Sequence, residues 1–193
     1  MNTHQEIVNT IQASIDVKKA ILSETQILEQ IETLANSCIL SLKKGGKVIF
    51  AGNGGSFADS QHLSAELVSR LQFDRGPLAS IALGTNSSSM SAIANDYGYD
   101  KVFARELDSI ANAQDVFIPI STSGNSPNII AAIGVGLTKG LNVIGFTGQS
   151  GGKMADLCTC IKVPSNRTER IQESHIMIGH IVCALVETGY FKQ

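Results

Sequence analysis

The sequence has little charge, no secretory signal, no apolar run suited to a membrane and no paired-cysteine motif. Only 17% of its 193 residues are Asp, Glu, Lys or Arg, against about a quarter in typical proteins, and the formal net charge is −2. Nucleic acids and anionic membranes require concentrated positive charge, so neither is an expected partner. With 43% hydrophobic residues, disorder is also excluded. The length predicts one domain with a substantial core.

The remaining absences predict a cytoplasmic protein. The first ten residues, MNTHQEIVNT, have neither the basic start nor the apolar run of a signal peptide. The longest charge-free stretch, 116–138, is long enough to span a bilayer, but its middle reads STSGNSPN, which is costly in lipid. The cysteines lack the CxxC pairs of a structural zinc site. They are therefore predicted to be reduced and mostly buried: Cys38, Cys158, Cys160 and Cys183.

The first 44 residues have the pattern of two helices. Apolar residues at three- and four-residue spacing form one stripe on the second helix: Ile27, Ile31, Leu34, Cys38 and Leu42. Ser23 is the predicted N-cap of that helix. The pair Gly45-Gly46 is predicted to end it.

After residue 45 the pattern changes to that of an α/β domain. Short runs rich in Val and Ile alternate with segments of helical length: KVIFAG, ASIALG, DVFIPI, NVIGFTG and CTCIKVP. Such alternation predicts a three-layer α/β/α sandwich around a parallel sheet of roughly five strands. The last helix is expected over about 169–188, with Gly189 as its C-terminal stop. It is apolar nearly all round after Ile176, so it should be buried within the domain or between subunits.

The first of two polar loops follows the first predicted strand. In AGNGGSFAD, Gly52, Gly54 and Gly55 allow a close backbone approach, and Ser56 is the predicted N-cap of the next helix. Free N–H groups at a helix N-terminus favour an anion. Taken alone, however, this loop is better explained as a simple turn from strand to helix.

The second loop, 121–127, favours a phosphate ligand. Ser126 is suited to cap the following helix, and Pro127 to its first position. Three more hydroxyls remain, those of Ser121, Thr122 and Ser123, at the carboxyl end of a presumed parallel strand, where α/β sheets bind ligands. Neither loop contains Lys or Arg, so a phosphate would be held by oriented dipoles.

Two predicted helices carry a further set of polar residues. His62 and Glu66 are four residues apart and share a helix face. On the last helix, Gln172 and His180 are separated by about 80° around the axis. Apolar neighbours predict that His180 is buried with a polar partner. Each pair alone is more often a solvated contact or a core histidine, so the residues by themselves leave these roles open.

Five segments carry a resemblance to a known family: AGNGGSFADSQHLSAEL, SAIANDYGYD, ISTSGNSPNII, FTGQSGGKMADL and RIQESHIMIGHI. In this order, and over essentially the whole chain, the sequence resembles the sugar isomerase (SIS) domain family and, within it, the bacterial phosphoheptose isomerases. The resemblance implies a flavodoxin-like SIS phosphosugar-binding domain in 45–193 and an oligomerising helical pair in 1–44, folded as one unit. It also implies a homo-oligomer, a tetramer.

The resemblance implies conversion of sedoheptulose 7-phosphate to D-glycero-D-manno-heptose 7-phosphate through an enediol, the first step of bacterial heptose synthesis for lipopolysaccharide or capsule. Glu66 would remove the proton and His180 would be the partner acid/base. Zinc, one ion per subunit, would be held by His62, Glu66, Gln172 and His180. The implied substrate contacts are Asn53, Gly54, Gly55, Glu66, Asn95, Asp96, Ser121, Thr122, Ser123, Ser126 and Gln172.

One alternative comes from another functional class. Some SIS proteins bind the replication initiator and are not known as isomerases, and they share several of these motifs. They tend to lack the helix Glu and the second His of the last helix. This chain has both, Glu66 and His180, which favours the enzyme.

Overall fold

A computed structural model describes residues 3–192, and its centre is one parallel sheet. The strand order is β2-β1-β3-β4-β5, the flavodoxin-like order. Every pairing is parallel. The strands are β1 (Val48–Gly52), β2 (Ser80–Ala82), β3 (Val116–Ile120), β4 (Asn142–Gly148) and β5 (Thr159–Val163). The predicted three-layer α/β fold with a five-stranded parallel sheet is confirmed.

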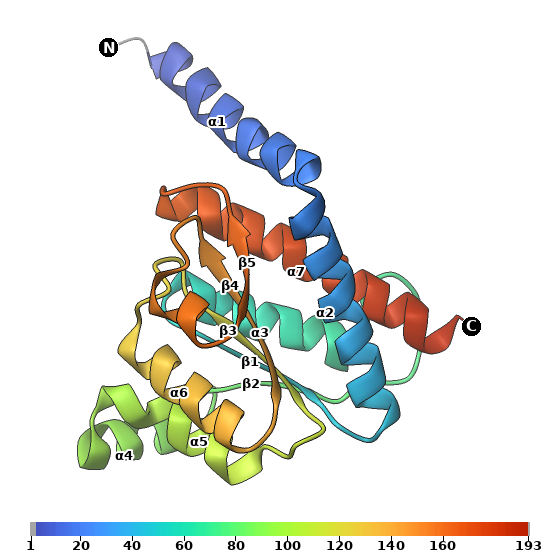
Figure 1. The fold of residues 1–193 in the computed structure, drawn as a ribbon, viewed down its shortest axis with the longest axis vertical. Coiled ribbons are helices and arrows are strands. Elements are labelled where there is room, and N and C mark those ends of the chain that lie inside the picture. Colours follow the sequence, from blue (N-terminus) through green and yellow to red (C-terminus); the bar gives the residue numbers. More distant parts are fainter. Residues whose placement is uncertain (1–2, 193) are drawn as a thin grey trace.

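Helices cover both faces of the sheet (Figure 1). On one face lie α2 (Thr25–Lys43), α3 (Gly55–Val68) and α7 (Thr168–Phe191), and their apolar residues share a core with Val48 and Phe50 of β1. The other face is covered by α4 (Ser87–Tyr97), α5 (Val102–Ile110) and α6 (Pro127–Thr138), which pack against Ile49 and Ala51 of the same strand. Successive residues of a strand point to opposite faces, so β1 supplies both cores.

Two short 3-10 helices complete the fold: η1 (Tyr99–Lys101) and η2 (Gly152–Asp156). The four cysteines are free, with Cys158 half-buried and the other three buried, as predicted. Within residues 3–192, no helix has the length and apolar character needed to cross a membrane.

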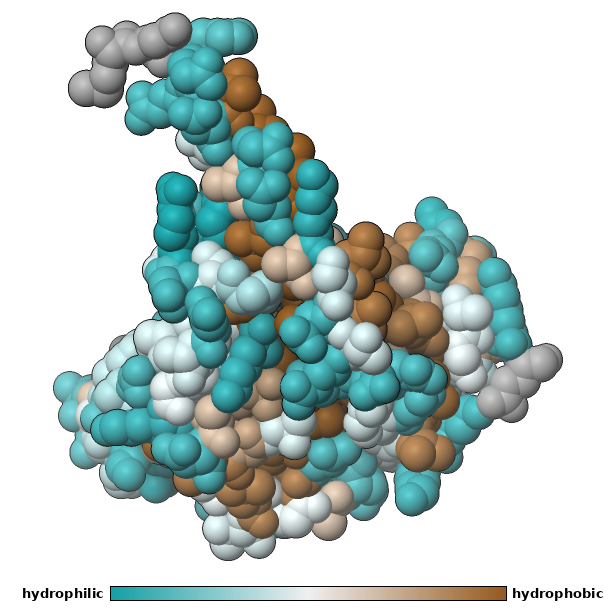
Figure 2. Space-filling model, turned by 45° about the horizontal axis from the view of Figure 1, so that its top comes forward, coloured by the Kyte–Doolittle hydropathy of each residue, from teal (hydrophilic) through white to brown (hydrophobic). Residues whose placement is uncertain are grey.

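The predicted N-terminal helical pair is present, and its first helix extends away from the body of the protein. Helix α1 (Thr3–Ser23) has Ile21 as its buried residue, whereas α2 buries the predicted stripe in the core. An apolar row stays exposed along α1, visible as brown atoms on the projecting helix in Figure 2: Ile7, Val8, Ile11, Ile15 and Leu22. On α7, Ile181 and Leu185 are also exposed.

Two predicted helix boundaries are wrong, the first because of a local hydrogen bond and the second because of a tertiary contact. Ser23 is the last residue of α1 and donates its hydroxyl to the Lys19 carbonyl at 2.9 Å, so it does not cap α2. Gly189 lies inside α7, which continues to Phe191. A Cβ atom on Gly189 would be 2.5 Å from Cδ1 of Ile39 on α2. This glycine therefore allows two helices to approach closely and does not end a helix.

Candidate active site

The two polar loops lie at the sheet's topological switch point, where the connections from neighbouring strands β1 and β3 diverge. In the first loop, Gly54 has φ +55° and is the residue that precedes α3. A Cβ atom on Gly52 would be 2.3 Å from the Ser56 carbonyl oxygen, so only glycine fits there. Ser56 is a buried residue in the first turn of α3, and the prediction that it caps the helix is wrong.

The second loop folds against the segment that follows β4. Ser126 is the N-cap residue of α6, but its hydroxyl lies 3.0 Å from the Ser121 hydroxyl and does not cap the helix. Gly124 has φ +66°, and a Cβ atom there would be 2.0 Å from the Gly151 carbonyl oxygen. The Met154 N–H donates to the Gly124 carbonyl at 3.0 Å. These contacts fix the loop's backbone at the carboxyl edge of the sheet.

A small polar pocket of about 240 Å³ opens beside this loop. Its lining contains no charged residue: Thr122, Ser123, Asn125, Gly148, Gln149, Ser150, Ser165, Asn166, Thr168 and Ile171. Thr168 is the first residue of α7, so the positive end of that helix's dipole contributes to the pocket. The neighbouring Arg167 is paired with Glu169 at 2.6 Å. The pocket therefore presents hydroxyls, amides and a helix N-terminus, a chemistry suited to a phosphate group.

A network of amide groups links the first loop to the opposite face of the sheet. Asn53 and Asn128 exchange two side-chain hydrogen bonds of 2.9 Å, and the Tyr99 hydroxyl donates to Asn53 at 3.2 Å. The sequence prediction included Asn53 but missed Asn128 and Tyr99. Asn95 and Asp96 lie exposed at the end of α4 and hydrogen-bond to each other at 2.8 Å.

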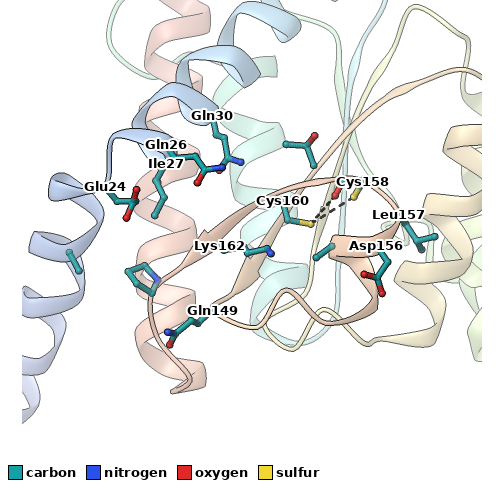
Figure 3. Close-up of a pocket in the computed structure, with 14 residues that line it drawn as sticks. Glu24, Gln26, Ile27, Gln30, Gln149, Asp156, Leu157, Cys158, Cys160 and Lys162 are labelled. Atoms are coloured by element: carbon teal, nitrogen blue, oxygen red, sulfur yellow. Dashed lines mark hydrogen bonds between the residues drawn. The ribbon is translucent and has the colours of Figure 1, made fainter.

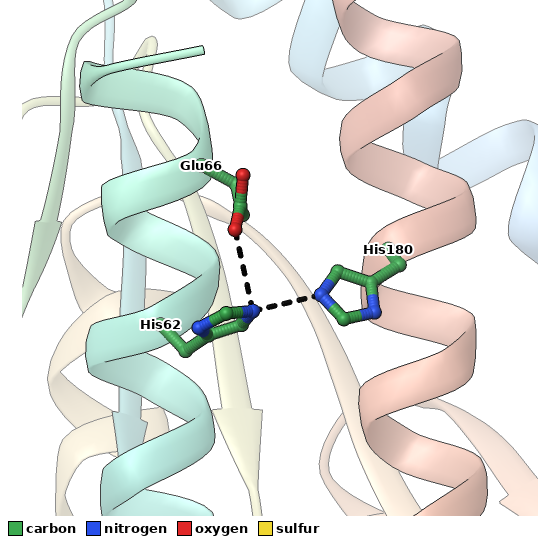
Figure 4. Close-up of side chains that lie close together, drawn as sticks. All are labelled: His62, Glu66 and His180. Atoms are coloured by element: carbon green, nitrogen blue, oxygen red, sulfur yellow. Dashed lines mark hydrogen bonds and ion pairs between the residues drawn. The ribbon is translucent and has the colours of Figure 1, made fainter. Parts of the chain in front are cut away.

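His62, Glu66 and His180 converge between α3 and α7 (Figure 4). One ligand atom from each lies within 4.8 Å of the others. The Nε2 atom of His62 is 2.8 Å from Nε2 of His180 and 3.3 Å from Oε1 of Glu66. His180 is half-buried, not buried as predicted. We call these three residues the His–Glu–His cluster.

The cluster has the character of a metal site. Three atoms with lone pairs repel one another unless protons or a cation lie among them. Two imidazole nitrogens and a carboxylate oxygen are ligands typical of zinc. The fourth predicted ligand, Gln172, lies about 12 Å before His180 along α7, at 1.5 Å per residue. Its side chain lies against Gly55, where a Cβ atom would be 2.7 Å from the Gln172 amide nitrogen.

Close helix packing brings the cluster together. Gly179 precedes His180, and a Cβ atom on it would be 2.4 Å from Cδ1 of Leu63, the residue after His62. The absence of a side chain at Gly179 thus allows α7 to approach α3 at the level of the two histidines. His62 lies on α3 and His180 on α7, so the two side chains meet only because the helices approach closely here.

Two titratable residues near the site were missed as functional candidates. Asp59, one turn before His62, has a buried Oδ2 atom without a hydrogen-bond partner among residues 3–192. Burial raises the pKa of Asp59, and the charges of His62 and His180 act in the opposite direction. His175 is the buried histidine of α7, and its Nε2 atom is 3.2 Å from the Thr147 carbonyl oxygen. Burial lowers the pKa of His175 to about 4.

Comparison with known proteins agrees with this geometry. The SIS domain family matches residues 12–148. Phosphoheptose isomerase of Aneurinibacillus thermoaerophilus is 54% identical over 187 residues, which cover 96% of this chain and 94% of that protein. Phosphoheptose isomerase of Burkholderia pseudomallei (strain K96243) is 48% identical over 186 residues, with coverages of 96% and 94%.

Solved structures give the same result. The phosphoheptose isomerase structure from Neisseria gonorrhoeae superimposes with a TM-score of 0.89 at 36% identity, covering 97% of this chain and 100% of that one. The one from Francisella tularensis has a TM-score of 0.93 at 30% identity, with the same coverages. These relatives support the isomerase hypothesis and give no support to the initiator-binding alternative. The chain therefore belongs to the phosphoheptose isomerases, aldose–ketose isomerases built on the SIS domain.

Proposed function

We propose that this enzyme interconverts sedoheptulose 7-phosphate and D-glycero-D-manno-heptose 7-phosphate through an enediol. The observation that carries the proposal is the placement of two sites along α7. The phosphate-sized pocket includes Ile171, and the His–Glu–His cluster includes His180, nine residues or about 13 Å farther along the helix. An extended seven-carbon chain with a terminal phosphate spans roughly 10 Å at about 1.2 Å per bond. This length is about 3 Å shorter than the spacing between the two backbone positions, and the side chains that project from the two sites can bridge that difference, so a heptose phosphate can contact both sites.

The phosphate group of the substrate would be bound without a Lys or Arg side chain. Thr122 and Ser123 line the neutral pocket, and the Ser121 and Ser126 hydroxyls contact each other beside it. Oriented N–H and O–H dipoles can bind a dianion, and they do so without the long-range attraction of Lys or Arg. Asn53, Gly54 and Gly55 from the first loop, with Asn95, Asp96 and Gln172, complete the proposed substrate contacts.

The reacting end would lie at the His–Glu–His cluster. Moving one hydrogen between adjacent carbons requires a base and an acid placed on either side of them. The Glu66 oxygen and the His180 nitrogen lie within 4.8 Å of each other, a spacing that suits two such groups. Oε1 of Glu66 faces His62, so Oε2 remains available to accept the substrate proton. Glu66 is the proposed base, and His180 is the proposed partner acid/base.

The proposal includes one zinc ion per subunit, held by His62, Glu66, His180 and Gln172. When bound, zinc would polarise the substrate carbonyl and stabilise negative charge on its oxygen. The side chains of His62 and Glu66 are 50% and 19% exposed, so the cluster is open to solvent and substrate. An amide is a weak zinc ligand, and modest affinity is therefore expected.

We further propose a homotetramer that acts in the cytoplasm and supplies heptose for lipopolysaccharide or capsule. The apolar row on α1 supports assembly, because Ile7, Ile11 and Leu22 are 55%, 57% and 72% exposed. A contiguous apolar surface of this kind marks an interface. The free cysteines are consistent with a reducing compartment. Light scattering during size exclusion tests the assembly, and a monomer at micromolar concentration would contradict it.

Isomerase turnover with sedoheptulose 7-phosphate tests the function directly. Glu66→Gln and His180→Ala are each expected to lower kcat by about 100-fold or more, because each removes one proton-transfer group. Asp108→Asn, at an exposed ion pair on α5, is the control and should retain wild-type turnover. Chelator treatment followed by zinc addition tests the metal. Near wild-type rates in both site variants, or no product from the wild-type enzyme, would refute the proposal.

A further inference from the structure

A second, larger cavity lies between the start of α2 and the edge strand β5 (Figure 3). Its volume is about 750 Å³, within the range of small-molecule sites. Its charged lining residues have both signs, with acidic Glu24 and Asp156 and basic Lys162. The cavity shares no residue with the His–Glu–His cluster, and it shares one residue, Gln149, with the pocket beside the second loop.

Two thiols face each other in the wall of this cavity. The Sγ atoms of Cys158 and Cys160 are 3.9 Å apart and point toward one another in Figure 3. Cys158 immediately precedes β5 and Cys160 is the second residue of that strand, so one position separates the two cysteines. A disulfide bond requires the two sulfurs to lie about 2.05 Å apart, so they must approach by about 2 Å from their separation in the structure.

The surroundings of the pair favour thiolate formation at one sulfur. The hydrogen bond from Cys158 holds the pKa of Cys160 below its ordinary value, burial opposes this, and the charge of Lys162 adds to the lowering. The same hydrogen bond, together with burial, raises the pKa of Cys158. Because the pKa of Cys160 is lowered and that of Cys158 is raised, Cys160 is the better nucleophile of the two.

We propose that Cys158 and Cys160 form a reversible dithiol site that small disulfides oxidise to an intrachain disulfide. A thiolate of the pair attacks one sulfur of the small disulfide, forms a mixed disulfide and expels one thiolate. The second cysteine then gives up its proton and attacks the mixed disulfide at the protein sulfur, which expels the other half. Both protein protons end on the two released thiols. The protein loses two electrons, which the small disulfide gains.

The cavity lining indicates which disulfides would react. A disulfide of an amino-acid or peptide thiol carries carboxylates and ammonium groups together. Lys162 can pair with a carboxylate, and Glu24 and Asp156 can pair with ammonium groups, so this zwitterionic class fits the cavity. The amide side chains of Gln26, Gln30 and Gln149 add neutral hydrogen-bonding partners.

The full-length protein allows a direct test, because trypsin cleaves after Lys153 and Lys162. The resulting peptide 154–162, MADLCTCIK, contains both cysteines and neither of the other two. After native incubation with glutathione disulfide or cystine and alkylation of remaining thiols, this peptide should have lost about 2 Da and carry no alkyl group. Dithiothreitol should restore both thiols.

Reactions of the other cysteines serve as internal controls. Burial raises the pKa of both Cys38 and Cys183, so these two should stay reduced while the pair oxidises. Cys160→Ser should abolish the internal disulfide, whereas Cys38→Ala should leave it unchanged. Lys162→Gln should slow formation of the disulfide, which is read in this variant on peptide 154–167 because the substitution removes the cleavage site after residue 162. Persistence of both thiols in peptide 154–162, a stable mixed disulfide, or disulfides only between chains would each overturn the proposal. This test measures the mass of a peptide, so its outcome does not depend on whether the protein has isomerase activity.

Discussion

Replacement of Glu187 with Gln is expected to destabilise the fold severely, because Glu187 is the centre of a buried charged network. Its carboxylate accepts hydrogen bonds from the backbone N–H groups of Leu71 and Gln72, at 3.0 and 2.8 Å, and from Nε of Arg75 at 2.9 Å. The Arg75 and Glu187 side chains are only 2% and 0% exposed. Arg75 also donates to four backbone carbonyls, one of which belongs to Glu66.

The expected loss of stability arises because an amide cannot replace all the interactions of the Glu187 carboxylate. Gln at position 187 keeps one acceptor oxygen but turns an NH₂ group toward a backbone N–H, so one donor is unsatisfied. It also leaves the Arg75 guanidinium buried without a counter-charge. Loss of one partner from a buried pair costs about 3–5 kcal/mol. For a chain of 193 residues, at about 2–4 °C per kcal/mol, this corresponds to a fall in Tm of roughly 6–20 °C.

The pH dependence provides a second signature of the same carboxylate. Burial alone would raise the pKa of Glu187, but the hydrogen bonds from Leu71, Gln72 and Arg75 outweigh it and lower the pKa. A lowered folded-state pKa gives stability that is present above the unfolded value of about 4.5 and is lost as the pH falls below it. Glu187→Gln should remove this part of the acid sensitivity.

Urea unfolding and calorimetry at one fixed protein concentration measure the effect, since assembly would otherwise change the Tm. Asp108→Asn is the matched control, because it breaks the exposed Lys139–Asp108 pair and should cost at most about 1 kcal/mol. If Glu187→Gln melts within about 2 °C of the wild type, the buried network does not stabilise the fold.

Two further predictions concern α7. Gly179→Ala should lower the free energy of unfolding by about 1–3 kcal/mol, because the added methyl group overpacks against Leu63, and it should weaken zinc binding measured by calorimetry. Gly134→Ala is the control: residue 134 faces open space on α6, so this change should raise the free energy of unfolding by about 0.5–1 kcal/mol. Unchanged zinc affinity in Gly179→Ala would contradict the packing argument. Because the pKa of His175 falls to about 4 on folding, the unfolded chain binds one more proton between pH 6.5 and 4. Stability should therefore drop by up to about 3 kcal/mol as the pH falls through this window, and His175→Gln should flatten the urea-unfolding profile there.

The sheet and the helices could be predicted from the sequence because their signals are local. Runs such as KVIFAG and NVIGFTG mark buried strands by composition alone, and the stripe from Ile27 to Leu42 marks α2 by its period. Helix ends were less predictable. Ser23 and Gly189 have the residue types of a cap and a stop, but packing of α7 against α2 overrides the local preference at Gly189.

The candidate site was only partly predictable for a related reason. His62 and Glu66 could be paired from their spacing, and the loop hydroxyls from their number. Asn128 and Asp59 could not be found, because nothing in their own segments shows that they lie beside Asn53 or near His180. Such neighbours are set by the crossing of elements distant in sequence, which periodicity does not report.

The geometry of the His–Glu–His cluster depends on two contacts at different levels of the α3–α7 interface. Gly179 sets the distance between the helices beside His180, and Arg75 joins the C-terminal end of α3, through the Glu66 carbonyl at 2.8 Å, to Glu187 on α7. The buried pair therefore holds the backbone of the proposed base. Glu187→Gln should consequently lower isomerase turnover at temperatures well below its Tm, although residue 187 is two turns from His180. Asp108→Asn has no such connection and should keep wild-type turnover at the same temperatures. If turnover of Glu187→Gln fell only at temperatures where the protein unfolds globally, the network would stabilise the fold without positioning Glu66.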